Sequence, residues 1–474
     1  MQDVVVEARS TAGFSEVLDP RDHERLDDAL ASLRNGLARR RLWQVSSTAT
    51  GGGVAELLTS LLPYVVGAGI EVRWLVIEPD DGFFGLTKRI HNQLHGREGD
   101  GGPLGDAERA RYDASLESTR AVLRSRIAPG DVAVLHDPQT AGLVRGLVDA
   151  GVHVAWRCHV GVDQPGPLAR RAWSFLRSDV EAAEAVVFSR AAHVWDCLPP
   201  DRVVIMPPCI DVLSPKNRDL APQLGMAVLR ACGLVPGGAA PVVVPGSSDG
   251  SLPVAIARRA SLCEDEPLPV DGRWVVQVSR WDELKDPVGV LEGFAASGPA
   301  DTDVHLVLAG PNVEGVSDDP EGGQILLEVR KAWGDLAPAA RRRVHLACLP
   351  MDDTHENALI VNALQRRADL VVQKSIAEGF GLTVAEAMWK QRPVLASRVG
   401  GIQDQIVDGE SGVLLDDPND LERFGRAIDA LLADRARSER LGRAARRRVC
   451  DRFLPVHHFE HEAAMVMQLV GAAP

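Results

Sequence analysis

The sequence lacks paired cysteines and long apolar runs. Its seven cysteines show no CxxC spacing, which argues against zinc sites and disulfide frameworks and favours a reducing compartment; they stand at positions 158, 197, 209, 232, 263, 348 and 450. No run approaches the roughly 20 apolar residues that span a bilayer, and the first residues lack a basic segment followed by an apolar one. We therefore expect a cytoplasmic protein without a membrane segment.

Basic residues are in the minority. The 52 Lys and Arg residues stand against 66 Asp and Glu residues, a formal charge of −14, which argues against general nucleic-acid binding but permits a local basic pocket for an anionic ligand. Hydrophobic residues make up 45% and charged residues 25%, near the averages for globular proteins. At 474 residues the chain is too long for one ordinary core, so we expect two domains.

The stretch STATGGGVAELLTSLL, residues 47–62, places three glycines directly before a helical pattern. The preceding LWQVSS predicts a strand, and apolar residues at three- and four-residue steps after the glycines predict a helix that stops near Gly67. With a strand at 71–78 this makes a βαβ unit. Further apolar runs at 131–137, 153–160 and 185–190 extend it into a doubly wound parallel sheet.

Proline and glycine interrupt this rhythm between Met206 and Asp271, which predicts an interdomain connection or a surface insertion. We place the boundary near Pro215, between an N-terminal domain of residues 1–215 and a C-terminal domain of residues 216–474. Six later runs predict a second Rossmann-like domain without a GxGxxG fingerprint, at 273–280, 303–311, 343–350, 369–375, 392–401 and 411–417. The tail from Asp420 is predicted to be helical, and its last helix could cross back to the N-terminal domain.

Charged residues follow two strands of the second domain, where the carboxyl ends of parallel strands bind ligands. The strand VVQVSR ends at Arg280 and Lys285 follows it, and a guanidinium with an ammonium suits a diphosphate. Glu378 and Glu386 follow the strand DLVVQKS and can accept hydrogen bonds from sugar or ribose hydroxyls. Backbone amides at the start of the next helix can hold an anion; they belong to Gly379, Phe380, Gly381 and Leu382. Taken singly, such residues are more often an exposed basic pair and helix-start or surface carboxylates.

In combination, these motifs resemble one family. The segment EGFGLTVAEAMWKQRPVLASRVGGIQDQIVDGESGVLL resembles the nucleotide-sugar signature of retaining family-4 glycosyltransferases, and SRWDELKD resembles their phosphate-binding segment. In the first half, WQVSSTATGGGVAELL, FFGLTKRIHNQLHG, LHDPQTAGLV, WRCHV and MPPCIDVLSPKNRDL resemble the trehalose-synthesising members. The resemblance covers about residues 42–220 and 274–415. It implies an α/β protein of the GT-B type, with two Rossmann-like doubly wound domains facing a central cleft.

The resemblance also implies a reaction. Enzymes of this group join a nucleotide-activated glucose to free glucose with retention, giving α,α-trehalose. Their favoured mechanism is a same-face one, in which the leaving phosphate oxygen takes the acceptor proton. Arg280 and Lys285 would stabilise the leaving diphosphate while Glu378 binds sugar hydroxyls. No cofactor is then required, because the two cations replace a metal ion, although stimulation by Mg²⁺ stays open.

The N-terminal domain carries the acceptor-side candidates. His159 matches a family histidine beside the transferred sugar, so it joins Arg280, Lys285 and Glu378 as a catalytic candidate. Acceptor binding is assigned to polar groups that can pair with the hydroxyls of a free sugar; they are His136, Asp137, Gln139 and Arg157. Donor binding is assigned to Glu386, to the amides of residues 379–382, and to three glycines that admit the phosphates; these are Gly51, Gly52 and Gly53. A tight turn without a ligand and a buried, satisfied histidine are the structural alternatives.

Other functions stay open. A retaining trehalose phosphorylase would use the same charged residues with glucose 1-phosphate, and a related transferase would use another sugar, an aminosugar or a cyclitol as acceptor. A nucleotide-sugar sensor without turnover is disfavoured because all the charged candidates are present together. The expected partners are a nucleotide diphosphate glucose of unassigned base and glucose, with no nucleic acid and no membrane; a homodimer stays open. No role is assigned to residues 1–40 or 233–272.

Overall fold

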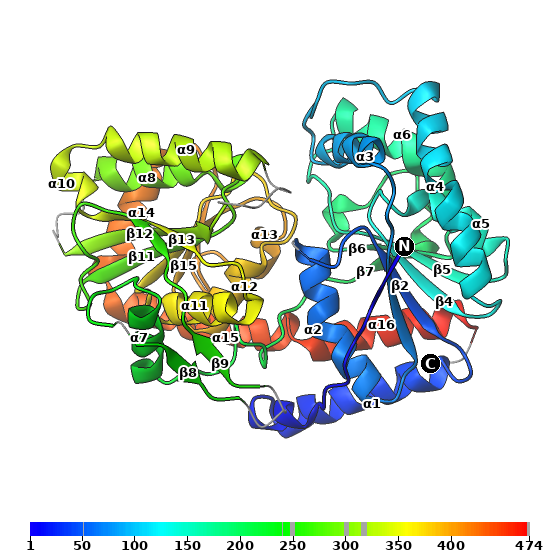
Figure 1. Ribbon diagram of the computed structural model, residues 1–474, viewed down its shortest axis with the longest axis horizontal. Coiled ribbons are helices and arrows are strands. Elements are labelled where there is room, and N and C mark those ends of the chain that lie inside the picture. The colour runs from blue at the N-terminus through cyan, green and yellow to red at the C-terminus, as the bar shows by residue number, and fades with distance from the viewer. Residues whose placement is uncertain (51, 239, 247–251, 298–302, 314–319, 472–474) are drawn as a thin grey trace. The chain divides into compact units, whose positions relative to one another are not determined.

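The computed structural model describes residues 1–50, 52–238, 240–246, 252–297, 303–313 and 320–471. The chain forms two compact units: residues 1–211 with 453–474 make up unit 1, and residues 212–452 make up unit 2. Each unit has its own seven-stranded sheet with helices packed on it (Figure 1). The two Rossmann-like α/β sheets expected from the sequence are confirmed.

The sheet of unit 1 is parallel except at one edge. Its strand order is β1-β3-β2-β4-β5-β6-β7, with β1 antiparallel to β3. The strands are β1 (Gln2–Val4), β2 (Leu42–Ser46), β3 (Val72–Val76), β4 (Val132–His136), β5 (His153–Cys158), β6 (Ala185–Phe188) and β7 (Val203–Ile205). Chain order reverses between β2 and β4, so the carboxyl ends of these two strands mark the position where such sheets bind ligands.

Helices cover both faces of this sheet. One face packs its aliphatic and aromatic residues against α3 (Asp81–Leu94), α4 (Asp106–Arg126), α5 (Val144–Val148) and α6 (Pro167–Val180). The other face packs against α2 (Gly53–Gly67) and α16 (Pro455–Leu469). Short 3-10 helices lie between these elements; they are η1 (Ala12–Glu16), η2 (Ala141–Leu143), η3 (Ala191–His193) and η4 (Pro200–Arg202).

The last helix of the chain belongs to unit 1. Helix α16 lies along α1 (Pro20–Gly36), as Figure 1 shows. The Arg25 guanidinium donates to both carboxylate oxygens of Glu460, at 2.8 and 2.7 Å. Ahead of the helix, the Ile210 N–H donates to the Phe453 carbonyl at 3.0 Å. These contacts bring α16 under the middle of the unit 1 sheet.

The sheet of unit 2 has the strand order β10-β13-β12-β11-β14-β15-β16, with β10 antiparallel to β13. Its strands are β10 (Ser261–Cys263), β11 (Arg273–Val278), β12 (Val304–Pro311), β13 (Val344–Leu349), β14 (Leu370–Gln373), β15 (Val394–Ser397) and β16 (Val413–Leu415). All six runs that the sequence assigned to this domain are therefore strands. Chain order reverses between β11 and β14, which places a second ligand-binding position at their carboxyl ends.

The helices of unit 2 alternate with its strands. They are α7 (Pro222–Ala231), η5 (Glu283–Lys285), α8 (Pro287–Ser297), α9 (Pro320–Gly334), α10 (Pro338–Arg341), α11 (Thr354–Arg367), α12 (Leu382–Trp389), α13 (Ile402–Gln405), α14 (Leu421–Ala433) and α15 (Arg435–Arg452). Apolar residues on β11 to β16 and on α8, α9 and α14 form one buried cluster.

The proline- and glycine-rich interruption contains regular structure as well as loops. It holds α7, a two-stranded hairpin of β8 (Val242–Val244) and β9 (Val254–Ile256), and the edge strand β10. The fully buried carboxylate of Glu356 on α11 accepts the N–H groups of Ala257 and Arg258 at 2.6 and 2.8 Å. Part of the interruption is thus fastened to the body of unit 2.

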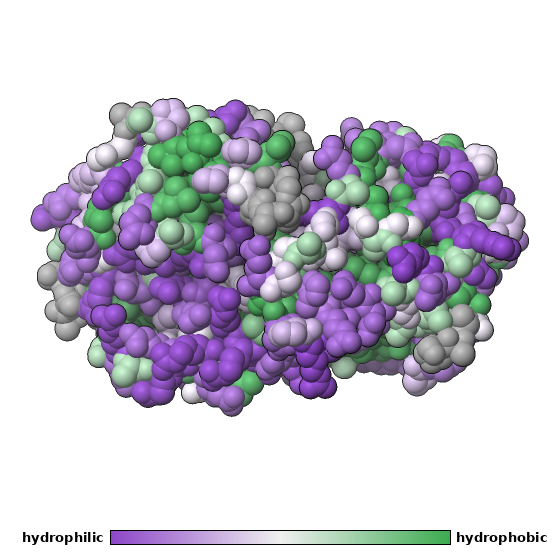
Figure 2. Space-filling view, turned by 90° about the horizontal axis from the view of Figure 1, so that it is seen from below, coloured by the Kyte–Doolittle hydropathy of each residue, from purple (hydrophilic) through white to green (hydrophobic). Residues whose placement is uncertain are grey.

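Within the described residues, no helix combines the length and apolar character needed to cross a bilayer. The face shown in Figure 2 is mainly hydrophilic, with hydrophobic residues in smaller patches.

Asp131 ties β4 to β2 and provides a test of the unit 1 fold. Its carboxylate accepts from Trp43 Nε1 and from the Arg41 N–H, both at 2.9 Å. Asp131→Ala leaves these buried donors unpaired, so we expect the free energy of unfolding to fall by about 3 kcal/mol. Urea unfolding followed by circular dichroism measures this, with the exposed Asp149→Ala as control. Equal unfolding midpoints for the two variants would contradict this account.

Candidate functional site

Two loops meet at the carboxyl ends of β11 and β14 in unit 2. The first contains Lys285 at the end of η5, and the second contains Glu378. The Lys285 ammonium forms an ion pair with the Glu378 carboxylate, and the side chains are 18% and 11% exposed. The Ile376 N–H also donates to the Leu284 carbonyl at 2.8 Å. The structure thus joins these two predicted catalytic residues at the reversal point of the sheet.

A second ion pair lies next to the first. Here the loop after β11 supplies the acidic residue and the loop after β14 supplies the basic one. Asp286 follows Lys285, and its carboxylate pairs with the fully buried Lys374, which ends the run DLVVQK. Lys374 Nζ also donates to the Pro418 carbonyl at 2.7 Å. From β11, Gln277 Nε2 donates to the Lys285 carbonyl at 2.9 Å. The Asp286–Lys374 pair and Gln277 therefore hold the backbone that carries Lys285.

Sequence reasoning missed both Lys374 and Asp286. Lysine is rarely buried without a partner, so a lysine in the run DLVVQKS, directly after four buried strand residues, is a signal of an ion pair. Its partner could not be identified from sequence, because Asp286 lies 88 residues earlier.

Glycines set the path of the backbone after Glu378. Gly381 precedes α12 with φ 85°, and Gly400 has φ 47°. A Cβ on Gly400 would lie 1.6 Å from the Glu378 carbonyl oxygen. Gln405 Nε2 donates to the carbonyls of Phe380 and Gly381, at 2.5 and 3.2 Å. The candidate donor-binding residues Gly379, Phe380, Gly381 and Leu382 are therefore held in one defined conformation.

The other predicted residues of unit 2 differ in exposure. Arg280 is 59% exposed and donates to Asp282 at 2.8 Å. Glu386 is buried on α12, with one carboxylate oxygen 3.5 Å from Lys216 Nζ, while its Oε2 has no hydrogen-bond partner in the part of the chain that the structure describes. One turn later, burial lowers the pKa of Lys390 to about 7. Donor binding by Glu386 stays a prediction.

In unit 1, two histidines meet at the ends of β4 and β5. His136 Nδ1 lies 3.0 Å from His159 Nε2, and the rings are stacked with centroids 5.2 Å apart. Asp137 adopts a left-handed conformation, φ 64°, and its Oδ1 accepts the His159 N–H at 2.7 Å. Burial raises the pKa of the Asp137 carboxyl to about 7. The structure therefore brings three predicted residues together.

Buried polar side chains from β2, β5 and α16 lie next to the histidines, in the interior of unit 1. His136 Nε2 lies 2.7 Å from Gln44 Oε1, and Gln44 Nε2 donates to Glu462 Oε1 at 3.4 Å. Gln44, His136, Glu462, Arg157 and His458 line a cavity of about 20 Å³. This volume suffices for one water molecule.

Arg157 points into this interior. Its side chain is buried, and NH2 donates to the Met206 carbonyl at 3.3 Å. Burial lowers the pKa of the guanidinium to about 10. A direct contact between Arg157 and an acceptor sugar stays a prediction. The burial of its side chain favours a role in holding the neighbouring residues in place.

Three residues of this buried group escaped sequence reasoning, namely Gln44, His458 and Glu462. Two signals were available. A glutamine stands in the middle of the otherwise apolar run LWQV, and the histidine and glutamate of the C-terminal tail are four residues apart, on one face of a helix. Neither signal indicates that the two segments meet.

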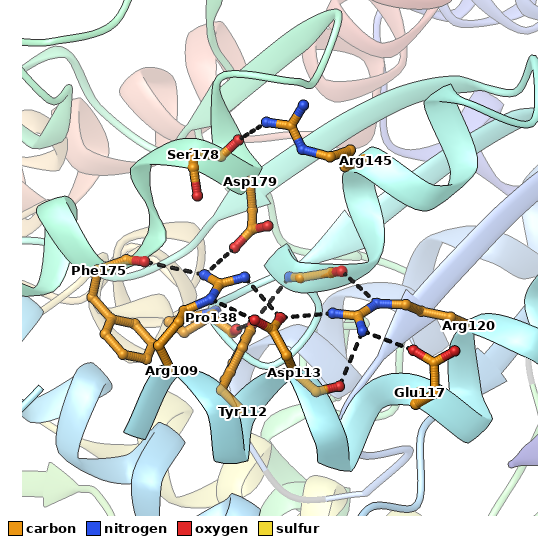
Figure 3. Close-up of polar contacts among 11 residues, drawn as sticks. Arg109, Tyr112, Asp113, Glu117, Arg120, Pro138, Arg145, Phe175, Ser178 and Asp179 are labelled. Carbon is orange, nitrogen blue, oxygen red and sulfur yellow. Dashed lines mark hydrogen bonds and ion pairs between the residues drawn. The ribbon is translucent and has the colours of Figure 1, made fainter. Parts of the chain in front are cut away.

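A polar network behind the β4 loop holds Pro138 in place, as Figure 3 shows. The Tyr112 hydroxyl donates to the Pro138 carbonyl at 2.5 Å and accepts from the Gly142 N–H at 3.0 Å. Arg120 Nε donates to the Gly142 carbonyl at 3.1 Å, and the Asp113 carboxylate joins Arg120 to Arg109. Arg109 in turn binds Asp179 on α6 at 2.5 Å. The loop carrying Asp137 and Gln139 is thus anchored to two helices.

The glycine turn lies beside an open hollow. Gly51 lies outside the described residues; Gly52 precedes α2 with φ 88°, and Gly53 begins the helix. A Cβ on Gly52 or Gly53 would meet nothing within 4 Å. Residues 47–50, 76–79, Gln2 and Phe84 line a hollow of about 480 Å³.

Gln139 Oε1 is buried with no hydrogen-bond partner among the described residues.

Among the described residues, no group of three or more His, Cys, Asp or Glu side chains is arranged to hold a metal ion.

Comparisons with known proteins agree on one family. The model of the trehalose synthase N-terminal domain matches residues 44–195, and that of glycosyl transferases group 1 matches residues 353–448. The trehalose synthase of Rubrobacter xylanophilus is 32% identical over 446 residues, which cover 93% of this chain and 94% of the relative. A trehalose phosphorylase of Pleurotus pulmonarius is 24% identical, and the match covers 86% of this chain but 54% of that protein.

Solved structures show the same fold. A UDP-forming α,α-trehalose-phosphate synthase from Burkholderia xenovorans matches with a TM-score of 0.66 and 15% identity, covering 92% of this chain and all of that one. The fold is therefore that of the GT-B glycosyltransferases.

The contact between Gly400 and Glu378 can be tested with a matched pair. Gly400→Ala and Gly409→Ala both place a side chain at positive φ, but only the first meets a backbone atom, since a Cβ on Gly409 has nothing within 4 Å. We expect Gly400→Ala to move Glu378 and lower glycosyl transfer by about tenfold or more, a loss of ~1.4 kcal/mol. Gly409→Ala should retain near-normal transfer. Equal activity of the two folded variants would show that Gly400 does not position Glu378.

Proposed function

We propose, from the premise that this chain belongs to the trehalose synthase family of glycosyltransferases, that it transfers glucose from a nucleotide diphosphate glucose to free glucose. The product would be α,α-trehalose, formed with retention. The observation that carries this proposal is the partly exposed Lys285–Glu378 pair at the reversal point of the unit 2 sheet, beside the amides that begin α12.

The pair suits a donor with a charged leaving group next to a neutral sugar. In the free protein the Glu378 carboxylate neutralises Lys285. A bound diphosphate would take over the ammonium and release Glu378 to accept hydrogen bonds from sugar hydroxyls. The amides of residues 379–382, at the N-terminus of an eight-residue helix, and the exposed Arg280 would bind the phosphate oxygens. Each candidate group thus meets the part of the donor that matches its charge.

The acceptor would bind unit 1 at the ends of β4 and β5. His159, Asp137 and Gln139 present nitrogen and oxygen atoms on two neighbouring loops. Free glucose carries hydroxyls that both donate and accept, and a mixed set of polar groups can pair with them. The network around Tyr112 would keep these groups in place before the sugar arrives.

The proposed reaction needs no side chain of the protein as a nucleophile. The bond from C1 of glucose to the diphosphate oxygen breaks, and the acceptor hydroxyl oxygen bonds to C1 on the same face. The departing phosphate oxygen takes the hydroxyl proton. Lys285 and Arg280 would stabilise the negative charge that develops on the diphosphate. A double displacement would need a free carboxylate at C1, whereas in this proposal the released Glu378 carboxylate accepts hydrogen bonds from the sugar hydroxyls.

Lys285→Ala tests the donor site. We expect kcat to fall by about two to three powers of ten, because one preorganised charge contact contributes roughly 3–4 kcal/mol in such transition states. The assay supplies glucose with UDP-, ADP- or GDP-glucose in turn and measures released nucleotide. The exposed Lys331→Ala is the control. A near-normal kcat in a folded Lys285→Ala protein would exclude this role.

Glucose 1-phosphate as sole donor tests the phosphorylase alternative in the same assay. Disaccharide formed with release of inorganic phosphate would replace nucleotide-sugar transfer as the function. Because the match spans about half of the fungal phosphorylase, we expect no such product.

A further inference from the structure

We propose that Glu462, acting through Gln44 and His136, fixes His159 in the tautomer that carries its proton on Nε2. His159 then presents a proton-free Nδ1 as a hydrogen-bond acceptor. The four side chains form one continuous series of contacts at 3.4, 2.7 and 3.0 Å. The part of the proposal that concerns a sugar hydroxyl at Nδ1 rests on the proposed function; the tautomer itself does not.

The carboxylate sets the orientation of the Gln44 amide. Glu462 Oε1 is 3.4 Å from one end of the amide, and an ionised carboxylate accepts hydrogen bonds but cannot donate them. The NH2 group of Gln44 must therefore face Glu462. The reverse orientation would bring two oxygens together inside a buried site, where unpaired polar atoms are costly. Gln44 Oε1 is left pointing at His136.

The amide oxygen in turn sets the proton of His136. Gln44 Oε1 can only accept, so His136 Nε2, 2.7 Å away, carries the hydrogen. Burial lowers the pKa of His136 to about 3, so the ring is neutral and holds a single N–H. His136 Nδ1 is consequently an acceptor.

The last step concerns His159. Its Nε2 lies 3.0 Å from the accepting Nδ1 of His136, so Nε2 must donate. Burial also lowers the pKa of His159, and a neutral ring with its proton on Nε2 has a lone pair on Nδ1. The bond from the His159 N–H to Asp137 Oδ1 fixes the backbone at the same point. A substrate hydroxyl would thus donate to His159.

The surroundings isolate this series from water. Gln44, His136 and Glu462 are 2%, 2% and 6% exposed. The other charged or titratable groups that act on them are Arg157, Cys209 and His458, with Asp137 at the open end. Burial raises the pKa of the Glu462 carboxyl to about 7, and the charge of Arg157 acts against this rise, so the required direction of the bonds holds at a pH above that value, where Glu462 is ionised. Glu462 touches no reacting atom in this scheme and is a positioning residue.

Nitrogen NMR of the free protein tests the tautomer. Protein labelled with 15N at histidine gives distinct Nδ1 and Nε2 signals for each tautomer, and His159→Gln identifies the signals of His159. At about pH 8.5, where Glu462 is ionised, we expect wild type to show the proton on Nε2. In Glu462→Gln the new amide can donate as well as accept, so Gln44 can turn over and His159 should show a mixture of tautomers. The control Gln468→Ala changes an exposed side chain on the same helix and should leave His159 unchanged.

Two results would overturn the proposal: a proton on Nδ1 of His159 in wild type, or an unchanged tautomer in folded Glu462→Gln. If Glu462→Gln does not fold, Gln44→Met removes the same acceptor from His136 with little change in volume, and the same mixture is expected. With glucose as acceptor, Glu462→Gln should raise KM about threefold or more with a smaller change in kcat. The expected tautomer in a protein that makes no trehalose would support the relay and refute the proposed function alone.

Discussion

Two neighbouring ion pairs hold together the loops that follow β11 and β14 in unit 2. In one pair the lysine stands on the first loop, and in the other it stands on the second. Lys285 and Asp286 are consecutive, and their partners Glu378 and Lys374 stand on the loop after β14 in the reverse order. Removing one member of a buried pair leaves an uncompensated charge, so the Asp286–Lys374 pair resists exchange with a ligand. The Lys285–Glu378 pair is reached by solvent and can exchange partners at lower cost. One pair thus fixes the geometry, and the other would supply the chemistry of the proposed transfer.

Unit 1 uses buried polar groups for a similar purpose. The ends of β4 and β5 place His136 and His159 in contact, and a carboxylate from the last helix of the chain supports them from below. Such a buried network stabilises a fold only if its members are well paired. Its presence under two candidate substrate-binding loops is more readily explained by the orientation of functional groups than by stability.

Much of this could be predicted from the sequence. The long strands of both sheets are buried on two faces and appear as continuous apolar runs, so they were found, together with Lys285 and Glu378 at their ends. The three-residue strands β1, β8, β9 and β10 carry too little pattern to be recognised, and a proline- and glycine-rich segment conceals three of them. The partners that depend on tertiary contact were also missed. Nothing local to Gln44 indicates a glutamate 418 residues later, and nothing local to Lys374 indicates Asp286.

The central claim is that this chain moves glucose from a nucleotide diphosphate to glucose with retention. An NMR time course of the purified protein, with glucose and each of UDP-, ADP- and GDP-glucose labelled with 13C at C1 of the sugar, tests it most directly. The account predicts an α,α-linked disaccharide whose labelled anomeric signal grows in step with nucleotide diphosphate. Release of nucleotide with labelled free glucose as the sole sugar product, or a β-linked product, would contradict it.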